Sequence, residues 1–166
     1  MGNIVSETDV KVIRNQIKRE PRGLRGVASR CALGYPQVIE TDTFLEEGQP
    51  FPTLYWITCP LKAKAISRLE DEGWAERLQE KIAGDVLFRQ RLRNAQEDYK
   101  ARRRLTGVKP DHPVMDTGIG GVRDLHAIKC LHAHYAHYLA TRENPIGETV
   151  HDNIVGLECT ERCDRS

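Results

Sequence analysis

The chain has 166 residues, with 25 Lys and Arg against 24 Asp and Glu, and a formal net charge of +1 at pH 7. This length can bury a core without disulfides or metal, and the balanced charge indicates neither disorder nor a general affinity for nucleic acids. No apolar run reaches the roughly 20 residues that cross a membrane, and the start of the chain lacks a secretory signal core. We therefore expect a cytoplasmic protein that does not bind membranes.

The first half of the chain predicts one helix followed by a small sheet. Ser6 and Asp9 are typical of a helix start, and the apolar spacing continues the helix over residues 7–19. Short β-type segments at 26–31 and 36–41 predict a strand pair. Residues 53–58, TLYWIT, have the strongest strand pattern, and their near-continuous hydrophobicity predicts a central strand.

Three helices are expected next. Pro60 suits the first turn of a helix that ends at Gly73, and a second helix covers residues 75–84. Asp85 can cap a longer third helix, in which one stripe is apolar. That stripe consists of Phe88, Leu92, Ala95 and Tyr99. A last short helix is expected over residues 148–155, after a turn at 144–147.

The third helix ends in a basic run, Arg102 to Arg104. Such a run could bind RNA or another polyanion. Cations at a helix C-terminus also interact favourably with the helix dipole, and this interpretation is favoured over nucleic-acid binding.

Residues 118–141, GIGGVRDLHAIKCLHAHYAHYLAT, are the segment most suggestive of chemistry, since they hold four of the six histidines and one cysteine. If the segment is helical, polar and apolar side chains fall on opposite stripes. The polar stripe contains Arg123, His126, Cys130, His134, His137 and Thr141. The opposite stripe, with Leu125 and Tyr135, would support the core, so we expect the polar one to face a cleft or a second buried surface.

The start of the same segment could bind an anion. Gly118, Gly120 and Gly121 allow backbone N–H groups to approach a ligand closely, and Arg123 follows one turn later. The alternative is that these glycines only form a flexible turn.

The cysteines provide the second indication of a site. Five widely spaced cysteines, Cys31, Cys59, Cys130, Cys159 and Cys163, fit thiols or metal ligands in a reducing compartment better than a disulfide framework. Cys31, Cys59 and Cys130 lie at element ends or on the histidine segment and could converge, although buried cysteines are often only small core residues. The other two lie in a charged tail, residues 156–166, which we expect to stand outside the site.

These segments resemble the bacterial family of domain of unknown function 501. The resemblance covers roughly residues 8–150 and rests on four blocks, RCALGYPQVIET, PFPTLYWITCPL, GIGGVRDLHAIKCLHAHYAH and NPIG. The family pattern includes Arg30-Cys31, Thr58-Cys59-Pro60, Lys129 to His132 and Ala136-His137. It includes His132 rather than His134.

The residues and the resemblance together favour a metal site of Cys31, Cys59, Cys130 and His137. Three thiolates and one imidazole suit tetrahedral zinc, and three thiolates could also hold an iron–sulfur cluster.

We therefore expect a single α+β domain over residues 1–155, with about three strands packed by helices. The leading hypothesis is a metal- or cluster-dependent enzyme acting on a small anionic substrate, with Cys130, His132 and His134 as catalytic candidates. A metal-free enzyme using Cys130 and His134 is the first alternative. An RNA- or protein-binding adaptor using Arg102 to Arg104 is the second.

Overall fold

The computed structural model describes residues 4–106, 108–154, 156–157, 159–160 and 162–164. These residues form a three-stranded antiparallel sheet, six α-helices and two short 3-10 helices. In chain order the elements are α1 (Glu7–Ile17), β1 (Leu24–Arg30), β2 (Pro36–Thr41), β3 (Tyr55–Ile57), α2 (Pro60–Asp71), α3 (Trp74–Gly84), α4 (Val86–Arg104), η1 (Pro113–Asp116), η2 (Ile119–Gly121), α5 (Leu131–Thr141) and α6 (Pro145–Ile154). The α+β prediction is confirmed.

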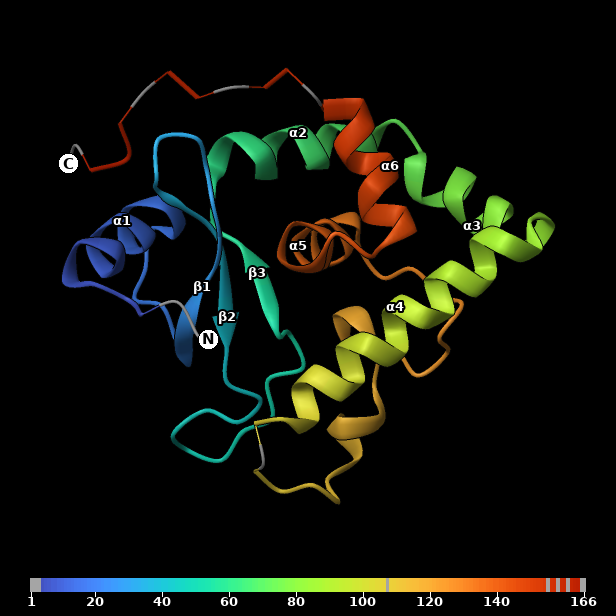
Figure 1. The fold of residues 1–166 in the computed structure, drawn as a ribbon, viewed down its shortest axis with the longest axis horizontal. Coiled ribbons are helices and arrows are strands. Elements are labelled where there is room, and N and C mark those ends of the chain that lie inside the picture. The colour runs from blue at the N-terminus through green and yellow to red at the C-terminus, as the bar shows by residue number, and fades with distance from the viewer. Residues whose placement is uncertain (1–3, 107, 155, 158, 161, 165–166) are drawn as a thin grey trace.

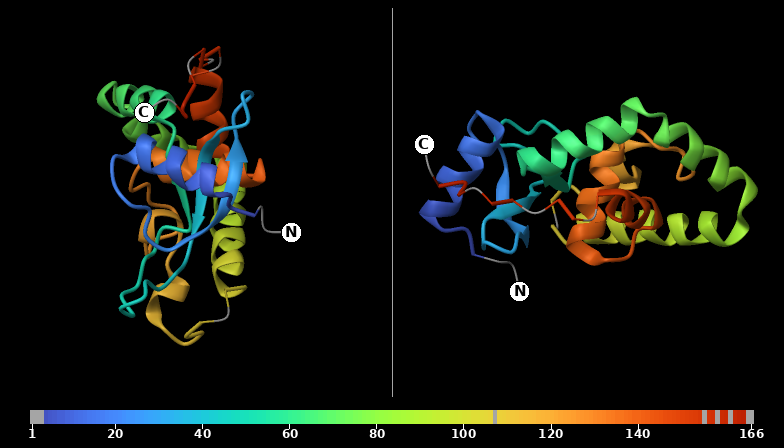
Figure 2. Two further views of the ribbon diagram at one scale, coloured as in Figure 1. Left: turned by 90° about the vertical axis from the view of Figure 1, so that its left-hand side faces the viewer. Right: turned by 90° about the horizontal axis from the view of Figure 1, so that it is seen from above.

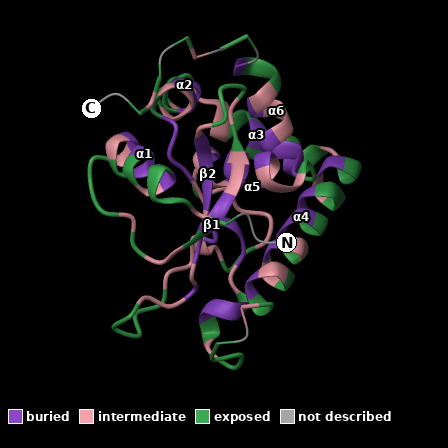
Figure 3. Ribbon diagram, turned by 60° about the vertical axis from the view of Figure 1, so that its left-hand side comes forward, coloured by how far each residue is buried: buried purple, intermediate pink, exposed green. Residues whose placement is uncertain are grey.

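The sheet separates two unequal layers. Helix α1 covers one face, where Ile13 packs with Val27 and Ile39. Helix α5 packs on the other face, and the helices from α2 onward share one continuous core with the strands (Figures 1 and 3). Helices α2 and α5, which carry candidate site residues, both contribute side chains to this larger core.

The strand order is β1-β2-β3, so β2 is central and β3 lies at the edge. The prediction of a central strand at residues 53–58 was wrong. The apolar character of β3 has another cause, because its neighbour beyond the sheet is α5, against which it packs (Figure 1). Tyr55 and Ile57 are each only 5% exposed.

Local capping explains why several helices begin where the sequence predicts. Ser6 and Asp9 form a reciprocal capping box at α1, and the Asp85 carboxylate accepts a hydrogen bond from the Phe88 N–H at α4. Helix α6 begins earlier than predicted, because Asn144 caps it through the Gly147 N–H at 2.9 Å. The predicted turn at 144–147 is therefore the first turn of a helix.

Helix α5 lies at the centre of the molecule (Figure 1). It contacts the sheet, α2 and α6, and its buried residues point in nearly every direction. A helix that is buried all round belongs to the core rather than to a surface. Figure 2 shows that the described part of the C-terminal tail runs from α6 back towards α1.

Candidate functional site

The histidine segment is not one continuous helix. Residues 122–130 form a loop, and α5 begins only at Leu131, with Cys130 as an extended N-cap residue. The predicted stripe from Arg123 to Thr141 was therefore wrong, since Arg123 and His126 lie outside the helix.

Two features keep this segment from being helical. Gly120 and Gly121 have positive φ angles of 76° and 81°, which a right-handed helix does not contain. Further along, the side chain of Gln79 donates to the His126 carbonyl at 2.7 Å and accepts from the Ile128 N–H at 3.2 Å. A partner on α3 thus satisfies backbone groups that a helix would have paired internally.

His134 and His137 face the interior rather than a cleft, and both side chains are 0% exposed. The Asn144 amide lies 3.2 Å from Nδ1 of each imidazole, and His137 Nε2 lies 2.9 Å from Asp98 Oδ2. Burial lowers the pKa of His134 to about 3, and hydrogen bonding to His137 lowers the pKa of Asp98. Both histidines are thus parts of a buried polar network that joins α4, α5 and α6.

The four residues predicted as metal ligands do not meet. Cys31 and Cys59 line a cavity beside α2, Cys130 lines a different cavity, and both ring nitrogens of His137 have partners in the core. Helical spacing suggested the grouping of Cys130 with His137, but the N-cap position turns Cys130 away from that buried face.

The structure instead places Cys130 with Glu70 and His132. One ligand atom from each of these three residues lies within 4.8 Å of the other two, the one such group found among the described residues. Glu70 comes from the last turn of α2, and His132 from the first turn of α5. The packing of α2 against α5 therefore brings together an oxygen, a sulfur and a nitrogen donor.

The contacts of His132 orient its ring. Nε2 lies 3.1 Å from the Ala63 carbonyl, and Nδ1 lies 3.2 Å from Glu70 Oε1. A carbonyl can only accept, so Nε2 carries a proton, and Nδ1 faces the carboxylate and the thiol side. Histidines that bind metals commonly donate their other N–H to a backbone carbonyl in this way.

Glu70 also caps the N-terminus of α5. Its Oε1 accepts a hydrogen bond from the Leu131 N–H at 2.8 Å, so a carboxylate sits at the N-terminus of α5, where negative charge is favourable. Capping alone would explain Glu70, but it would not explain the thiol and the imidazole beside it.

A cavity of about 310 Å³ adjoins Cys130 and His132. Its lining includes the cationic side chains of Arg19 and Lys129 and the aromatic rings of Tyr55 and Trp56. The cavity therefore suits a small anion that also carries an apolar part.

Of the predicted anion-binding residues, only Gly120 lines this cavity. The Gly118 and Gly121 N–H groups donate to the carbonyls of Val122 and Gly118, and the Ile119 N–H donates to Gln96. These amides are used within the chain. Arg123 is exposed on the loop, so the cations at the cavity are Arg19 and Lys129 instead.

The pKa of Cys130 bears on the metal-free alternative. Burial raises this pKa, and the N–H groups of Ala133 and His132 at the start of α5 oppose the rise only in part. Nucleophilic cysteines normally have a lowered pKa. The intended partner His134 is buried in the network described above, and His132 lies beside the thiol instead.

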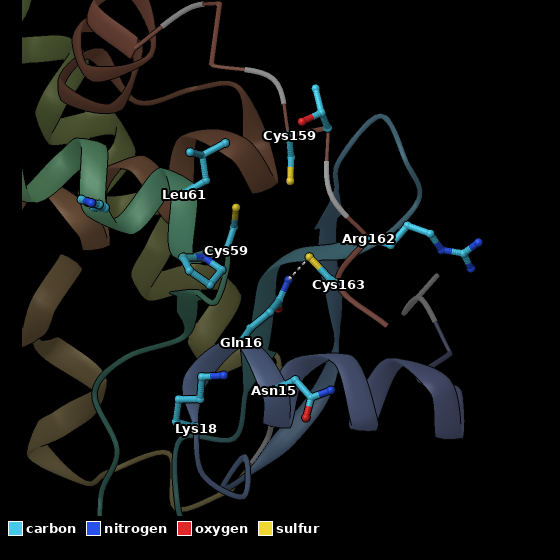
Figure 4. Close-up of a pocket in the computed structure, with 11 residues that line it drawn as sticks. Asn15, Gln16, Lys18, Cys59, Leu61, Cys159, Arg162 and Cys163 are labelled. Carbon is cyan, nitrogen blue, oxygen red and sulfur yellow. Dashed lines mark hydrogen bonds between the residues drawn. The ribbon is translucent and has the colours of Figure 1, made fainter. Parts of the chain in front are cut away.

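Four cysteines gather at a second place. Cys59, Cys159 and Cys163 line a cavity of about 560 Å³, and Cys31, Cys59 and Cys159 line an adjacent one of about 400 Å³. Figure 4 shows the sulfur atoms of Cys59, Cys159 and Cys163 pointing into the space between α1, α2 and the tail. All five cysteines are thiols rather than disulfides.

All three arginines at the basic end of α4 make contacts within the chain. Arg102 pairs with Asp98 at 2.7 Å, and Arg104 pairs with Asp116. Arg103 is 0% exposed and donates to the carbonyls of Val114, Thr117 and Pro52. Of the three arginines that the adaptor hypothesis invokes, Arg103 is buried, whereas Arg102 and Arg104 remain partly exposed beside their acidic partners.

Sequence reasoning missed Glu70, the cationic pair at the cavity, and the proximity of the tail cysteines to Cys59. Nothing in the local pattern distinguishes Glu70 from other helix-surface acids. The spacing of Cys159 and Cys163, four residues apart, was the one available signal for the tail.

A family model described as "Protein of unknown function (DUF501)" matches residues 27–152, more than half of the chain. The chain belongs to the DUF501 family. No curated protein and no solved structure matches it. The predicted resemblance is thus confirmed.

The DUF501 match contains all three residues of the group Glu70, Cys130 and His132, whereas Cys159 and Cys163 lie beyond its end. In the part of this DUF501 protein that the structure describes, no helix is both long and apolar enough to cross a membrane.

Proposed function

We propose that this DUF501 protein is a cytoplasmic metal-dependent enzyme that acts on a small anionic substrate, with Glu70, Cys130 and His132 as metal ligands. The observation that carries the proposal is the convergence of these three donor atoms within 4.8 Å, next to a cavity lined by Arg19 and Lys129. The thiol state of the cysteines fits a reducing compartment.

The donor set suits zinc. Catalytic zinc sites commonly have three protein ligands of nitrogen, sulfur or oxygen and keep a fourth position for water or substrate. Bound zinc would act as a Lewis acid or lower the pKa of that water. Residues of the chain would orient the ligands and bind the substrate. The Ala63 carbonyl orients His132, while Arg19 and Lys129 attract the anion.

A metal-free enzyme is less well supported by the same geometry. The ring nitrogens of His132 face Ala63 and Glu70, so neither is committed to the Cys130 thiol. Metal binding accounts for all three side chains at once, because a metal ion would favour the thiolate and accept the carboxylate and imidazole together.

The test uses two substitutions that preserve the fold. Glu70→Gln keeps an oxygen that can accept from the Leu131 N–H, and Cys130→Ser places a better N-cap residue before α5. We expect both variants to unfold at temperatures close to that of the wild type after metal removal. We also expect each to lose one equivalent of bound zinc, measured by elemental analysis after dialysis against a zinc buffer.

Ser67→Ala is the matched control, because Ser67 lies 3.3 Å from His132 Nε2 but supplies none of the three donor atoms. It should retain the metal. Equal zinc content in wild type, Glu70→Gln and Cys130→Ser would refute the proposed centre.

A further inference from the structure

The four cysteines beside α1 and α2 form a cluster that the proposed enzyme site does not use. They come from three parts of the chain. Cys31 begins the turn between β1 and β2, Cys59 is the N-cap residue of α2, and Cys159 and Cys163 belong to the tail. Cys59 is only 8% exposed, although it lies at a helix start.

The four cysteines line two cavities that share part of their lining. Cys59 and Cys159 line both cavities, Cys31 lines one and Cys163 lines the other. The three sulfur atoms drawn in Figure 4 point into one space rather than into solvent on separate sides.

The tail is held to the body of the protein at this cluster. Gln16 Nε2 lies 3.7 Å from Cys163 Sγ and 2.7 Å from the Pro36 carbonyl. A buried amide therefore links α1, the start of β2 and a tail residue 147 positions away.

The charge around the cluster is positive. Among the described residues no Asp or Glu lines either cavity, whereas several cations do: Lys18, Lys64 and Arg162 at one, Arg30, Lys62 and Arg142 at the other. Arg30 and Arg162 have acidic partners elsewhere. Four thiolates around one divalent ion carry a net negative charge, which the lysines would offset.

We propose that Cys31, Cys59, Cys159 and Cys163 form a second metal centre, ligated by four thiolates, that fastens the C-terminal tail to the body of the protein. Four thiolates are the ligand set of structural zinc and of four-iron clusters. No three of these sulfur atoms lie within 4.8 Å of one another. Tetrahedral zinc with Zn–S bonds of about 2.3 Å would require the sulfur atoms to move to about 3.8 Å from one another. The ligand sulfur atoms of a four-iron cluster lie farther apart.

The centre can be isolated by working in the Cys130→Ser chain, where the proposed enzyme site lacks its thiolate. This chain is purified without oxygen and analysed for zinc, iron and acid-labile sulfide. We expect either one equivalent of zinc, or about four of iron with matching sulfide, which identifies a cluster. A chain with neither, even after incubation with zinc or with iron and sulfide, would overturn the proposal while leaving the enzyme site untouched.

Single substitutions then test the ligands. Adding Cys163→Ser or Cys159→Ser should remove that metal, whereas Thr160→Ala, between the two cysteines, should keep it. Both cysteines are partly exposed in the tail, so the body of the protein should still fold. Retention of the full metal content in Cys163→Ser would contradict the assignment.

The absorption spectrum of bound cobalt distinguishes a site with four thiolate ligands from a site with one. Titration of the zinc-free Cys130→Ser chain with Co²⁺ should produce an intense thiolate-to-cobalt absorption, which falls in steps as thiolates are removed. Chelation should also lower the unfolding temperature of this chain but not that of its Cys163→Ser derivative, because a bound metal stabilises the folded state. A weak absorption equal in both chains would overturn the four-thiolate centre.

Discussion

His134 is a fully buried titratable residue. Its side chain is 0% exposed, Nδ1 faces the Asn144 amide, and burial lowers its pKa to about 3. The Asn144 amide donates to Nδ1, so the proton of the neutral ring is on Nε2. Among the described residues Nε2 has no hydrogen-bond partner. His134 is therefore a neutral core residue, and protonating it would cost stability.

Because protonation of His134 destabilises the folded state, the free energy of unfolding should depend on pH. The ordinary pKa of the imidazole is 6.5 and that of folded His134 is about 3, so between these values the unfolded chain binds more protons than the folded one. The free energy of unfolding should therefore fall as the pH drops, by about 2 kcal/mol from this residue between pH 7 and pH 5.

Denaturant unfolding at the two pH values measures the effect. His134→Asn is the matched variant, because its Oδ1 can accept from Asn144 in place of Nδ1 and the side chain does not titrate. Its stability should change less between pH 7 and pH 5 than that of the wild type. An identical change in both chains would show that His134 is not buried in its neutral form.

At the scale of elements, the contact of α5 with α6 organises the helical layer. Gly147 lies in the first turn of α6, and a Cβ there would stand 2.3 Å from Tyr138 Cβ and 2.5 Å from the His134 carbonyl oxygen. The block NPIG thus has a physical explanation. Asn144 caps α6, and its side-chain amide contacts the imidazoles of His134 and His137. Gly147 permits the close approach of α5 and α6.

Gly147→Ala should therefore destabilise the protein by about 3 kcal/mol, as overpacking against backbone does. Gly84→Ala is the control, because no atom lies within 4 Å of its Cβ position at the end of α3. That change should be neutral or stabilise by about 0.5 kcal/mol. Thermal or denaturant unfolding compares the two. Equal effects would show that α5 and α6 are not packed as closely as described.

Capping residues and apolar stripes predicted most of the helices, because these signals are local. Ser6 and Asp85 mark their helix starts correctly, and Phe88 and Tyr99 are buried as their spacing indicates. The helix over residues 118–141 failed for a non-local reason. The Gln79 side chain takes the hydrogen bonds of the loop before α5, and no pattern within the segment indicates that contact.

At the scale of the molecule, chain segments far apart in sequence assemble both candidate metal sites. Glu70 lies 61 positions from Leu131, whose N–H it binds, and Cys163 lies 147 positions from Gln16. The sequence indicated cysteine and histidine as candidate ligand types. It could not decide which of them meet, because that depends on α5 packing on α2 and on the tail returning towards α1 (Figures 1 and 2).

The proposed metal centre at Glu70, Cys130 and His132 has one sulfur ligand. X-ray absorption spectroscopy of bound zinc tests it most directly, in a chain where Cys159→Ser and Cys163→Ser together remove two ligands of the four-cysteine centre. The proposed centre predicts one sulfur at about 2.3 Å and nitrogen or oxygen neighbours at about 2.0–2.2 Å. Zinc surrounded only by sulfur, or a chain that binds no zinc, would contradict it.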